Sequence, residues 1–474
     1  MRRLACLLAL AALPGCASTP SPDGFRDVER LVAEGTGART QWIRGDEDDR
    51  AAAEAVRRLL AQPLAAEDAV QVALLNNRGL QASYGELGVA QADLVQAGLL
   101  RNPVFRASRI RSPDLVTTAL GVEFDFLGLL LRPRAREIEA ARFESLKLRV
   151  ADDVLRVAAE VRVGYYRAMA SAQAAAIQES MLAAAEAAAE LAARQYNAGN
   201  LNLRDQARRQ VAYVESRAQL ARERQRAASD RERLNRLLGL SGSQTGWRLP
   251  EKLPEPPRSR PDYGDLERLA VVQRLDVGAA RRDVEYVGKV LGITRSTRYL
   301  AVLDLGIDWE KDSGEPAQVG PTLRLELPLF DQGQARIARY EALFRGSAER
   351  LSQVAIDARS EAREKSSDLQ AAWEIARQHA EALVPLRRRI LAQTQLFYNG
   401  MLDGVYELLA DYRESAAAAQ ALVEAQRDYW IALAELERAV GGRLPPPAAA
   451  DAETPPPAGR DGFDAKKPSA HDHH

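Results

Sequence analysis

The segments YLAVLDLGIDW, residues 299–309, and LRLELPL, residues 323–329, decide the fold of this chain. In both segments apolar residues occupy every second position, and Asp, Gly, Arg, Glu or Pro stand between many of them. This alternation is typical of a strand with one apolar face. With a polar, glycine-containing turn near residue 313, the two segments predict a β-hairpin over residues 298–330. The residues predicted to face lipid are Leu305, Ile307, Trp309, Leu325 and Leu327.

The hairpin belongs to the second copy of an internal duplication. Identical residues recur at a constant offset of 202 positions: Tyr196, Asn197, Leu234, Arg236 and Gly239 return as Tyr398, Asn399, Leu436, Arg438 and Gly441. The duplication predicts a first repeat over 66–248, with a hairpin at 103–127, and a second repeat over 262–442. In each copy a medium helix, at 66–98 and 263–295, precedes the hairpin, and a long helical hairpin follows it.

The predicted long helices cover residues 134–196 and 203–239 in the first copy and 334–398 and 405–441 in the second. At 1.5 Å per residue, about 60 helical residues extend over ~90 Å, which indicates a coiled coil and not a compact globule. Apolar positions recur at alternating steps of four and three residues. They are Val154, Ala158, Val161, Tyr165, Ala168 and Ala172 in the first copy, and Leu383, Leu386, Ile390, Gln393 and Phe397 in the second. Pro385 predicts a bend in the second long helix.

Four strands in one chain are too few to close a membrane barrel, and an open sheet edge cannot face lipid. Three protomers supply twelve strands, enough for a barrel with apolar residues outside and charges toward a wet lumen. The expected fold is therefore mainly α, with long antiparallel coiled-coil helices and a membrane β part completed by trimerisation. A soluble β-sandwich insert is the alternative interpretation of the strands, but it does not explain why hairpins recur at equivalent places of the repeat.

The first fifteen residues predict an export signal, with Arg2 and Arg3, an apolar run and Gly15 before Cys16. The stretch Leu13-Pro14-Gly15-Cys16 resembles a bacterial lipobox, so Cys16 is expected to carry lipid, and Ala17 after it favours the outer membrane. An ordinary secretory signal with an incidental cysteine is the alternative. Residues 16–65 are expected to be an irregular anchor segment, 249–261 a Pro-rich linker, and 443–474 a disordered tail.

Composition excludes several classes of function. The formal charge is −1 and becomes −3 without Arg2 and Arg3, with charges of both signs interspersed, so nothing indicates nucleic acid. Cys6 leaves with the signal, so the mature chain has no disulfide. No nucleophile with a base, phosphate loop or spaced metal-ligand set is visible, and His379 stands alone on a predicted helix. The sequence therefore predicts neither an enzyme nor a cofactor.

Three motifs resemble the TolC-like outer-membrane factor family over nearly the whole mature chain. They are Glu67-Asp68-Ala69-Val70 leading into Ala73-Leu74-Leu75-Asn76-Asn77, then Ala97-Gly98-Leu99-Leu100-Arg101-Asn102-Pro103, and Leu327-Pro328-Leu329-Phe330-Asp331-Gln332-Gly333. The family also shows a turn with Tyr, Gly and an acidic residue, here Tyr196, Gly199 and Asp205. The second copy departs from it, because Met401 stands where the first copy has its glycine.

The resemblance implies a homotrimer in the outer membrane with a long helical tunnel in the periplasm. The far end of the tunnel would dock on a periplasmic adaptor protein and an inner-membrane transporter. In relatives the second turn bears the narrowest ring, so Glu407, with Asp403 and Asp411 one turn to either side, is the expected pore constriction. Three symmetry-related carboxylates repel one another and concentrate cations. The alternative is that these acids are solvated and favour the start of a helix.

The residues expected to contact the adaptor are apolar or small and lie at the two turns between long helices. They are Gly199, Leu201, Leu402, Gly404 and Val405.

The sequence leaves more than one class of exported solute in consideration. The turn from Tyr398 to Leu402 resembles the branch of the family associated with copper and heavy-metal efflux. His471, His473 and His474 form a cluster that suits soft or borderline metal ions, and an engineered tag or a tail without a role explains it equally.

Two other functions fit the same sequence. One is a periplasmic coiled-coil scaffold or adaptor lipoprotein that does not span the outer membrane, and in it the apolar strand faces would be buried. The other is an exit duct for type I protein secretion, which shares the fold and differs in its partners.

Overall fold

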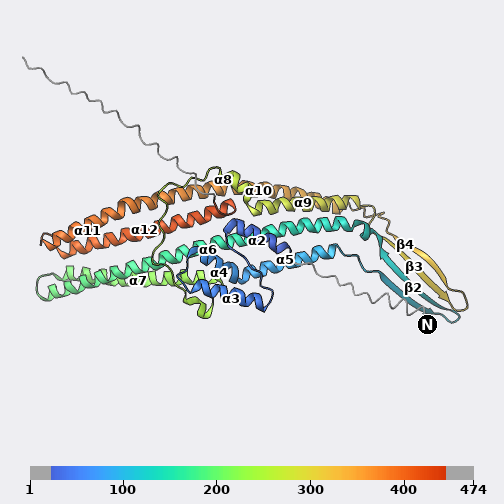
Figure 1. Ribbon diagram of the computed structural model, residues 1–474, viewed down its shortest axis with the longest axis horizontal. Helices are drawn as coiled ribbons and strands as arrows, with labels where there is room; N and C mark the ends of the chain where they lie inside the picture. The colour runs from blue at the N-terminus through green and yellow to red at the C-terminus, as the bar shows by residue number, and fades with distance from the viewer. Residues whose placement is uncertain (1–22, 445–474) are drawn as a thin grey trace, which may run out of the picture.

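The computed structural model describes residues 23–444. The molecule is elongated: a β-sheet occupies one end, and two helical hairpins reach the opposite end (Figure 1). Cys16 with the predicted signal, and His471, His473 and His474, lie outside the described residues.

The same order of elements occurs twice. The first set is α4 (Ala66–Asn76), α5 (Arg78–Ala97), β1 (Val104–Arg111), β2 (Val116–Asp125), α6 (Phe126–Asn197) and α7 (Leu203–Leu238). The second set is α8 (Leu266–Gln273), α9 (Leu275–Ser296), β3 (Leu303–Asp312), β4 (Gln318–Leu325), α10 (Gln334–Gln378), the π-helical turn η2 (His379–Leu383), α11 (Val384–Asn399) and α12 (Val405–Val440). A short 3₁₀ helix, η1 (Gly242–Gly246), lies between the sets. The mainly helical fold with long helices and antiparallel strands is thus confirmed.

Each predicted medium helix is broken at one residue, and the end of a long helix docks at the break. In the first copy Asn77 is extended and its side chain caps α5 by accepting from the backbone N–H groups of Gly79 and Leu80. The Asn76 amide donates to the Gly239 carbonyl at 2.7 Å. Gly239 adopts a φ of +68°, and a Cβ on it would lie 2.6 Å from the Asn76 carbonyl oxygen, so glycine is required there.

The second copy repeats this joint with a different residue. Arg274 separates α8 from α9, and its guanidinium donates to the Ala439 carbonyl at 3.3 Å. Gly441, with a φ of +91°, ends α12 against the backbone of Arg274. An arginine thus replaces the asparagine pair at the equivalent place.

The N-terminal segment is helical, and the prediction of an irregular stretch over 16–65 was wrong for its described part. Helices α2 (Asp23–Thr36) and α3 (Asp46–Leu60) occupy it. Phe25, Val28 and Val32 on α2 are buried at helical spacing. Acidic residues in the first turn and arginines in the last turn of α3 match the helix dipole.

The long helices accommodate two prolines, Pro133 and the predicted bend residue Pro385. Helix α6 begins at Phe126 and not at residue 134, because Asp125 caps it through a 2.6 Å bond from the Gly128 N–H and Pro133 is accommodated inside it. The π-helical turn η2 ends at Leu383, α11 begins at Val384, and Pro385 therefore lies in the first turn of α11. A π-helical turn is a recognised place for a helix to change direction.

Within the described residues the sheet has four antiparallel strands in the order β1-β2-β3-β4. Leu305 pairs with Phe124 and Leu323, and Ile307 pairs with Val122 and Pro321, so apolar residues from different strands share one face. Strand β4 ends at Leu325, so the prediction of Leu327 as a strand residue was wrong. Pro328, which has no N–H to donate, follows Leu327 directly.

The core lies at mid-length, where the shorter helices cover α6, α10 and α12. Val154, Ala158, Val161, Tyr165 and Ala168 of the first-copy stripe are buried there against α2, α4 and α5. Ala172, the last residue of that stripe, is exposed, so its prediction as a seam residue was wrong within this chain. A second cluster joins α8 to α10 and α12. Tyr166 stacks on Trp430 with ring centroids 5.5 Å apart, which joins α6 to α12.

The long helices form one layer in the order α7, α6, α12 and then α10 with its continuation α11. Helix α6 packs along α7 on one side and α12 on the other, and α12 packs along α10 and α11. Helix α7 lies at one edge of this layer and α11 at the opposite edge (Figure 1).

Candidate functional site

The two hairpin tips, farthest from the sheet, adopt the same backbone turn with different residues. In the first tip Gly199 has a φ of +78°. In the second tip Met401 takes the equivalent place with a φ of +59°. A left-handed conformation costs a residue with a side chain about 1–2 kcal/mol relative to the right-handed region. The second copy, which has Met401 where the first copy has Gly199, therefore keeps the same turn and carries a large apolar side chain on it.

The second tip exposes more apolar surface than the first. Met401 is 93% exposed and Leu402 76% exposed. Gly199 and Gly404 are exposed, whereas Leu201 and Val405 are half-buried, which makes the latter two the less accessible of the predicted adaptor contacts.

The three predicted constriction carboxylates do not share one environment. Glu407 is exposed in the first turn of α12 and folds back toward Gly404 at the start of that helix. Asp403 is half-buried in the turn. Asp411 accepts a 2.5 Å hydrogen bond from the Thr394 hydroxyl of α11, so its carboxylate lies inside the helical hairpin. Of these three carboxylates, Glu407 is the most exposed to solvent.

A contact between the two tips was missed by the sequence analysis. The Tyr406 hydroxyl of α12 donates to the Gln195 side-chain oxygen of α6 at 2.6 Å. The Arg209 guanidinium of α7 lies 4.2 Å from the centre of the Tyr406 ring. The residue 202 positions before Tyr406 is Arg204, so Tyr406 differs from its counterpart in the first copy. This difference was the one sequence signal that could have pointed to Tyr406. This contact fixes the second tip against the first hairpin.

The sheet separates apolar from charged side chains by face. On the apolar face Ile307 is 62% exposed and Leu323 62% exposed, while Trp309 is half-buried. On the opposite face Arg324 bonds to Asp304 and lies 2.6 Å from a carboxylate oxygen of Glu123. Exposed apolar residues in a contiguous patch mark a surface that is covered by lipid or by another molecule.

The second-copy stripe, which runs from the end of η2 into α11, is only partly covered within the described residues. Leu383, Leu386, Ile390 and Phe397 are between 36% and 53% exposed. At the other edge of the layer, α7 exposes Leu203, Val211 and Val214. The role of the stripe as a coiled-coil seam stays a prediction. The sheet is open in the same way, because β1 and β4 each pair on one side.

Residues 23–444 offer neither a metal cluster nor a transmembrane helix. No group of three or more His, Cys, Asp or Glu side chains there is arranged to hold a metal ion. No helix in that range is both long enough and apolar enough to cross a membrane.

A duplicated helical layer joined to an open four-stranded sheet defines the class: the described chain has the TolC-like outer-membrane channel fold. It is similar to the outer membrane channel CmeC of Campylobacter jejuni, with 14% identity, coverage of 88% of this chain and 92% of that one, and a TM-score of 0.67. It is also similar to a membrane protein of Pseudomonas aeruginosa, with 18% identity, 82% and 93% coverage, and a TM-score of 0.65. The outer membrane protein VceC of Vibrio cholerae has 16% identity, 80% and 96% coverage, and a TM-score of 0.65. No family model and no curated protein matches the sequence.

Proposed function

We propose that this protein is one protomer of a trimeric outer-membrane exit duct, through which a tripartite efflux system expels small solutes. The observation that carries the proposal is the pair of open edges. Strands β1 and β4 end the sheet, and α7 and α11 end the helical layer. Unlike edges that complete one another in successive copies produce a closed ring by head-to-tail association.

The sheet supports the membrane part of the proposal. Strands β2 and β3 have 10 residues each and β1 and β4 have 8, close to the ~9–11 residues of a membrane-crossing strand. Three copies of four strands give twelve, which removes every open edge. The apolar face then contacts lipid, and the face with Arg324, Asp304 and Glu123 lines the passage.

The helical layer supports the tunnel. In a ring, the exposed stripe of α11 packs on α7 of the next protomer, and the seam that is incomplete in one chain becomes a continuous coiled coil. The tips then lie together at the end far from the sheet, where an adaptor protein and an inner-membrane transporter dock. Met401 and Leu402, with Gly199 and Gly404 beside them, are the proposed adaptor contacts, and lipid on Cys16 is the proposed additional anchor.

Glu407, with Asp403, is the proposed constriction of the duct. Asp411 is not part of this proposed ring, because its carboxylate accepts a hydrogen bond from the Thr394 hydroxyl inside the hairpin. Replacing both Glu407 and Asp403 with Ala removes like charges around the pore, and we expect resting conductance to rise and cation preference to fall. Planar-bilayer recording measures both, with Asp411→Asn as control; unchanged conductance and selectivity would remove Glu407 and Asp403 from the gate.

Small organic solutes such as drugs are the first candidate for the cargo. Heavy-metal ions are the second candidate, and it rests on the sequence of the second turn and on the terminal histidines. The test compares the metal tolerance of cells that carry the intact chain with that of cells that carry a variant in which His471, His473 and His474 are replaced by Ala. Lower tolerance with the variant is expected if the tail takes part in metal export, and equal tolerance would exclude that role.

The decisive experiment is to purify the mature protein from membranes, measure its mass in detergent and record conductance in planar bilayers. A trimer with stable conductance is expected. A monomer that stays in solution without detergent and gives no conductance would refute the duct.

A further inference from the structure

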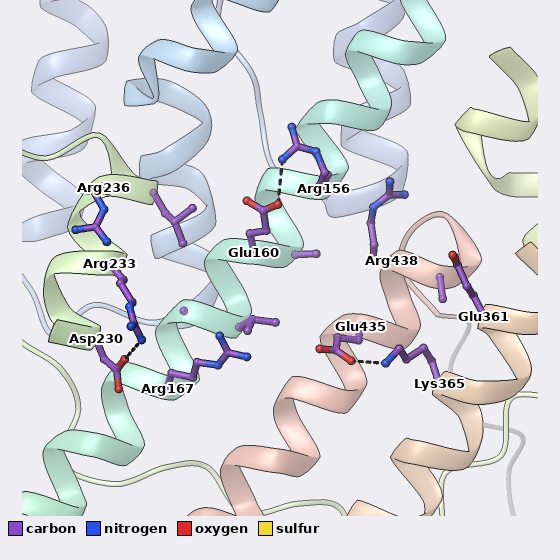
Figure 2. A pocket seen from close by; sticks show the side chains of 15 residues that line it. Arg156, Glu160, Arg167, Asp230, Arg233, Arg236, Glu361, Lys365, Glu435 and Arg438 are labelled. Carbon is purple, nitrogen blue, oxygen red and sulfur yellow. Dashed lines mark hydrogen bonds and ion pairs between the residues drawn. The ribbon is translucent and has the colours of Figure 1, made fainter. Parts of the chain in front are cut away.

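A large pocket lies on the helical layer at mid-length, between the two halves of the chain. It has a volume of about 720 Å³ and opens on the side of α6 that α2, α4 and α5 leave uncovered (Figure 2). Helices α6, α7, α10 and α12 all contribute to it. Its charged lining residues are Arg156, Glu160, Arg167, Asp230, Arg233, Arg236, Glu361, Lys365, Glu435 and Arg438.

Every carboxylate in this lining already has a cation. Glu160 binds Arg156 at 3.0 Å, Asp230 binds Arg233 at 3.1 Å, and Glu435 binds Lys365 at 2.9 Å (Figure 2). Glu361 binds Arg274, which lies outside the pocket, and Arg438 binds Asp152, also outside it. The described lining thus has six basic and four acidic side chains, an excess of two positive charges.

Arg167 and Arg236 account for this excess. Within residues 23–444 no carboxylate lies within ion-pair distance of either guanidinium. Both side chains are exposed, and Figure 2 shows that Arg167 extends from α6 toward the side where Glu435 and Lys365 meet. A guanidinium presents a planar set of N–H donors that matches a carboxylate, sulfonate or phosphate group.

Apolar surface separates the charged groups. Val163 and Leu237 line the pocket, together with Ala159 and Ala439. Gly164 allows Leu237 to lie over α6, because a Cβ on Gly164 would approach the Leu237 Cδ1 to 3.1 Å. Pockets that bind small molecules typically combine such an apolar surface with a few fixed polar groups, within roughly 300–1,000 Å³.

We propose that this pocket binds amphiphilic organic anions, with Arg167 contacting the acidic group, Val163 and Leu237 contacting the apolar body, and Arg236 adding positive charge on the α7 side of the pocket. The pocket deepens the proposed function by naming a class of solute, and it rests on that function only for its place in the transport path. Binding itself is a property of the purified chain.

The test uses the full-length protein in lipid nanodiscs and the probe naphthalene-1-sulfonate, with naphthalen-1-ylmethylammonium as the probe of opposite charge. Isothermal titration is expected to show saturable binding of the sulfonate and none of the ammonium. Arg167→Gln should weaken binding about tenfold and Arg236→Gln by less, and the double variant should abolish it. Arg222→Gln is the matched control: it removes one exposed arginine of α7 that is outside the pocket lining and binds Gln219.

Equal affinity in the double variant and the wild type, or equal binding of both probes, would overturn the inference. Circular dichroism and mass in detergent, unchanged in the variants, show that a loss of binding is not a loss of fold. Conductance distinguishes the two proposals: a conducting protein that does not bind the sulfonate refutes the pocket alone, and a binding protein that does not conduct refutes the duct alone.

Discussion

Tyr406 shows how one side chain can couple the two halves of the duplicated chain. Its hydroxyl reaches Gln195 and its ring meets Arg209, so the second tip is fixed to the first hairpin by two contacts. The net value of such a hydrogen bond is about 0.5–1.5 kcal/mol, small enough to be broken by docking of a partner.

Tyr406→Phe removes the hydrogen bond and keeps the ring. In the proposed duct we expect a two- to tenfold rise in open probability at rest, which corresponds to that free energy, as roughly 1.4 kcal/mol is a factor of ten. Single-channel recording measures it. Tyr412→Phe on the same helix is the control, and a Tyr406→Phe channel that stays closed like the control would show that the contact does not hold the tip.

Glu437 predicts a dependence of stability on pH. Burial raises the pKa of Glu437, and the nearby Arg162 guanidinium opposes the shift. Because the folded pKa is raised, the ionised carboxylate destabilises the fold above that pKa, and this cost disappears as the pH falls toward the unfolded value.

We therefore expect the wild type to gain stability relative to Glu437→Gln as the pH is lowered from 7 toward about 4.5. Thermal unfolding of both proteins across this range tests the sign. A difference between the two proteins that is constant with pH would contradict it.

The candidate residues were only partly predictable from the sequence. Exposure of Leu402 and Glu407 follows from their place at a turn, and the structure agrees. The bond from Thr394 to Asp411 and the contact of Tyr406 with Gln195 depend on how two helices face each other, which residue spacing within one helix does not determine.

At the scale of elements, regular periodicity was the reliable signal. The hairpin strands and their apolar face follow from alternation, and the long helices follow from the duplication. Element ends were less predictable: the break at Asn77 and the start of α6 at Asp125 depend on local side-chain caps, and β4 ends two residues before Leu327. Helices α2 and α3 were missed although Phe25, Val28 and Val32 recur at helical spacing, so the signal for α2 was present in the sequence.

The stripe on α11 gives a test at this scale. Leu386→Asp with Ile390→Asp places two charges in the proposed seam with α7 of the next protomer, and we expect the trimer to dissociate in detergent because burying an unpaired charge is costly. Gln395→Asp adds a charge at an exposed position of α11 outside the stripe and should leave the mass unchanged. Mass measurement in detergent decides; a stable trimer with both charges would exclude α11 from the interface.

At the scale of the whole molecule, the sheet and the helical layer both end in edges that have no neighbour within the described chain. Each has two unlike edges, and the exposed apolar residues lie on the sheet face and along the outer helices. The sequence indicated that four strands cannot close alone, but it did not indicate that the second-copy stripe is left unpaired while the first-copy stripe is buried. That difference arises because the first-copy stripe lies at mid-length under α2, α4 and α5, whereas the second-copy stripe lies nearer the tip; at mid-length the second copy is buried as well, at Ala358, Ala362 and Leu369.

The divergence of the two tips has a consequence for any ring built from this chain. Three protomers carry six tips, which occupy six nearly equivalent places but alternate between a glycine turn and a methionine turn. A sixfold-symmetric partner would meet two chemistries in alternation. Gene duplication would thus have left one set of positions to hold the shape and freed the other to acquire specificity, so variation between homologues should concentrate on the Met401 side.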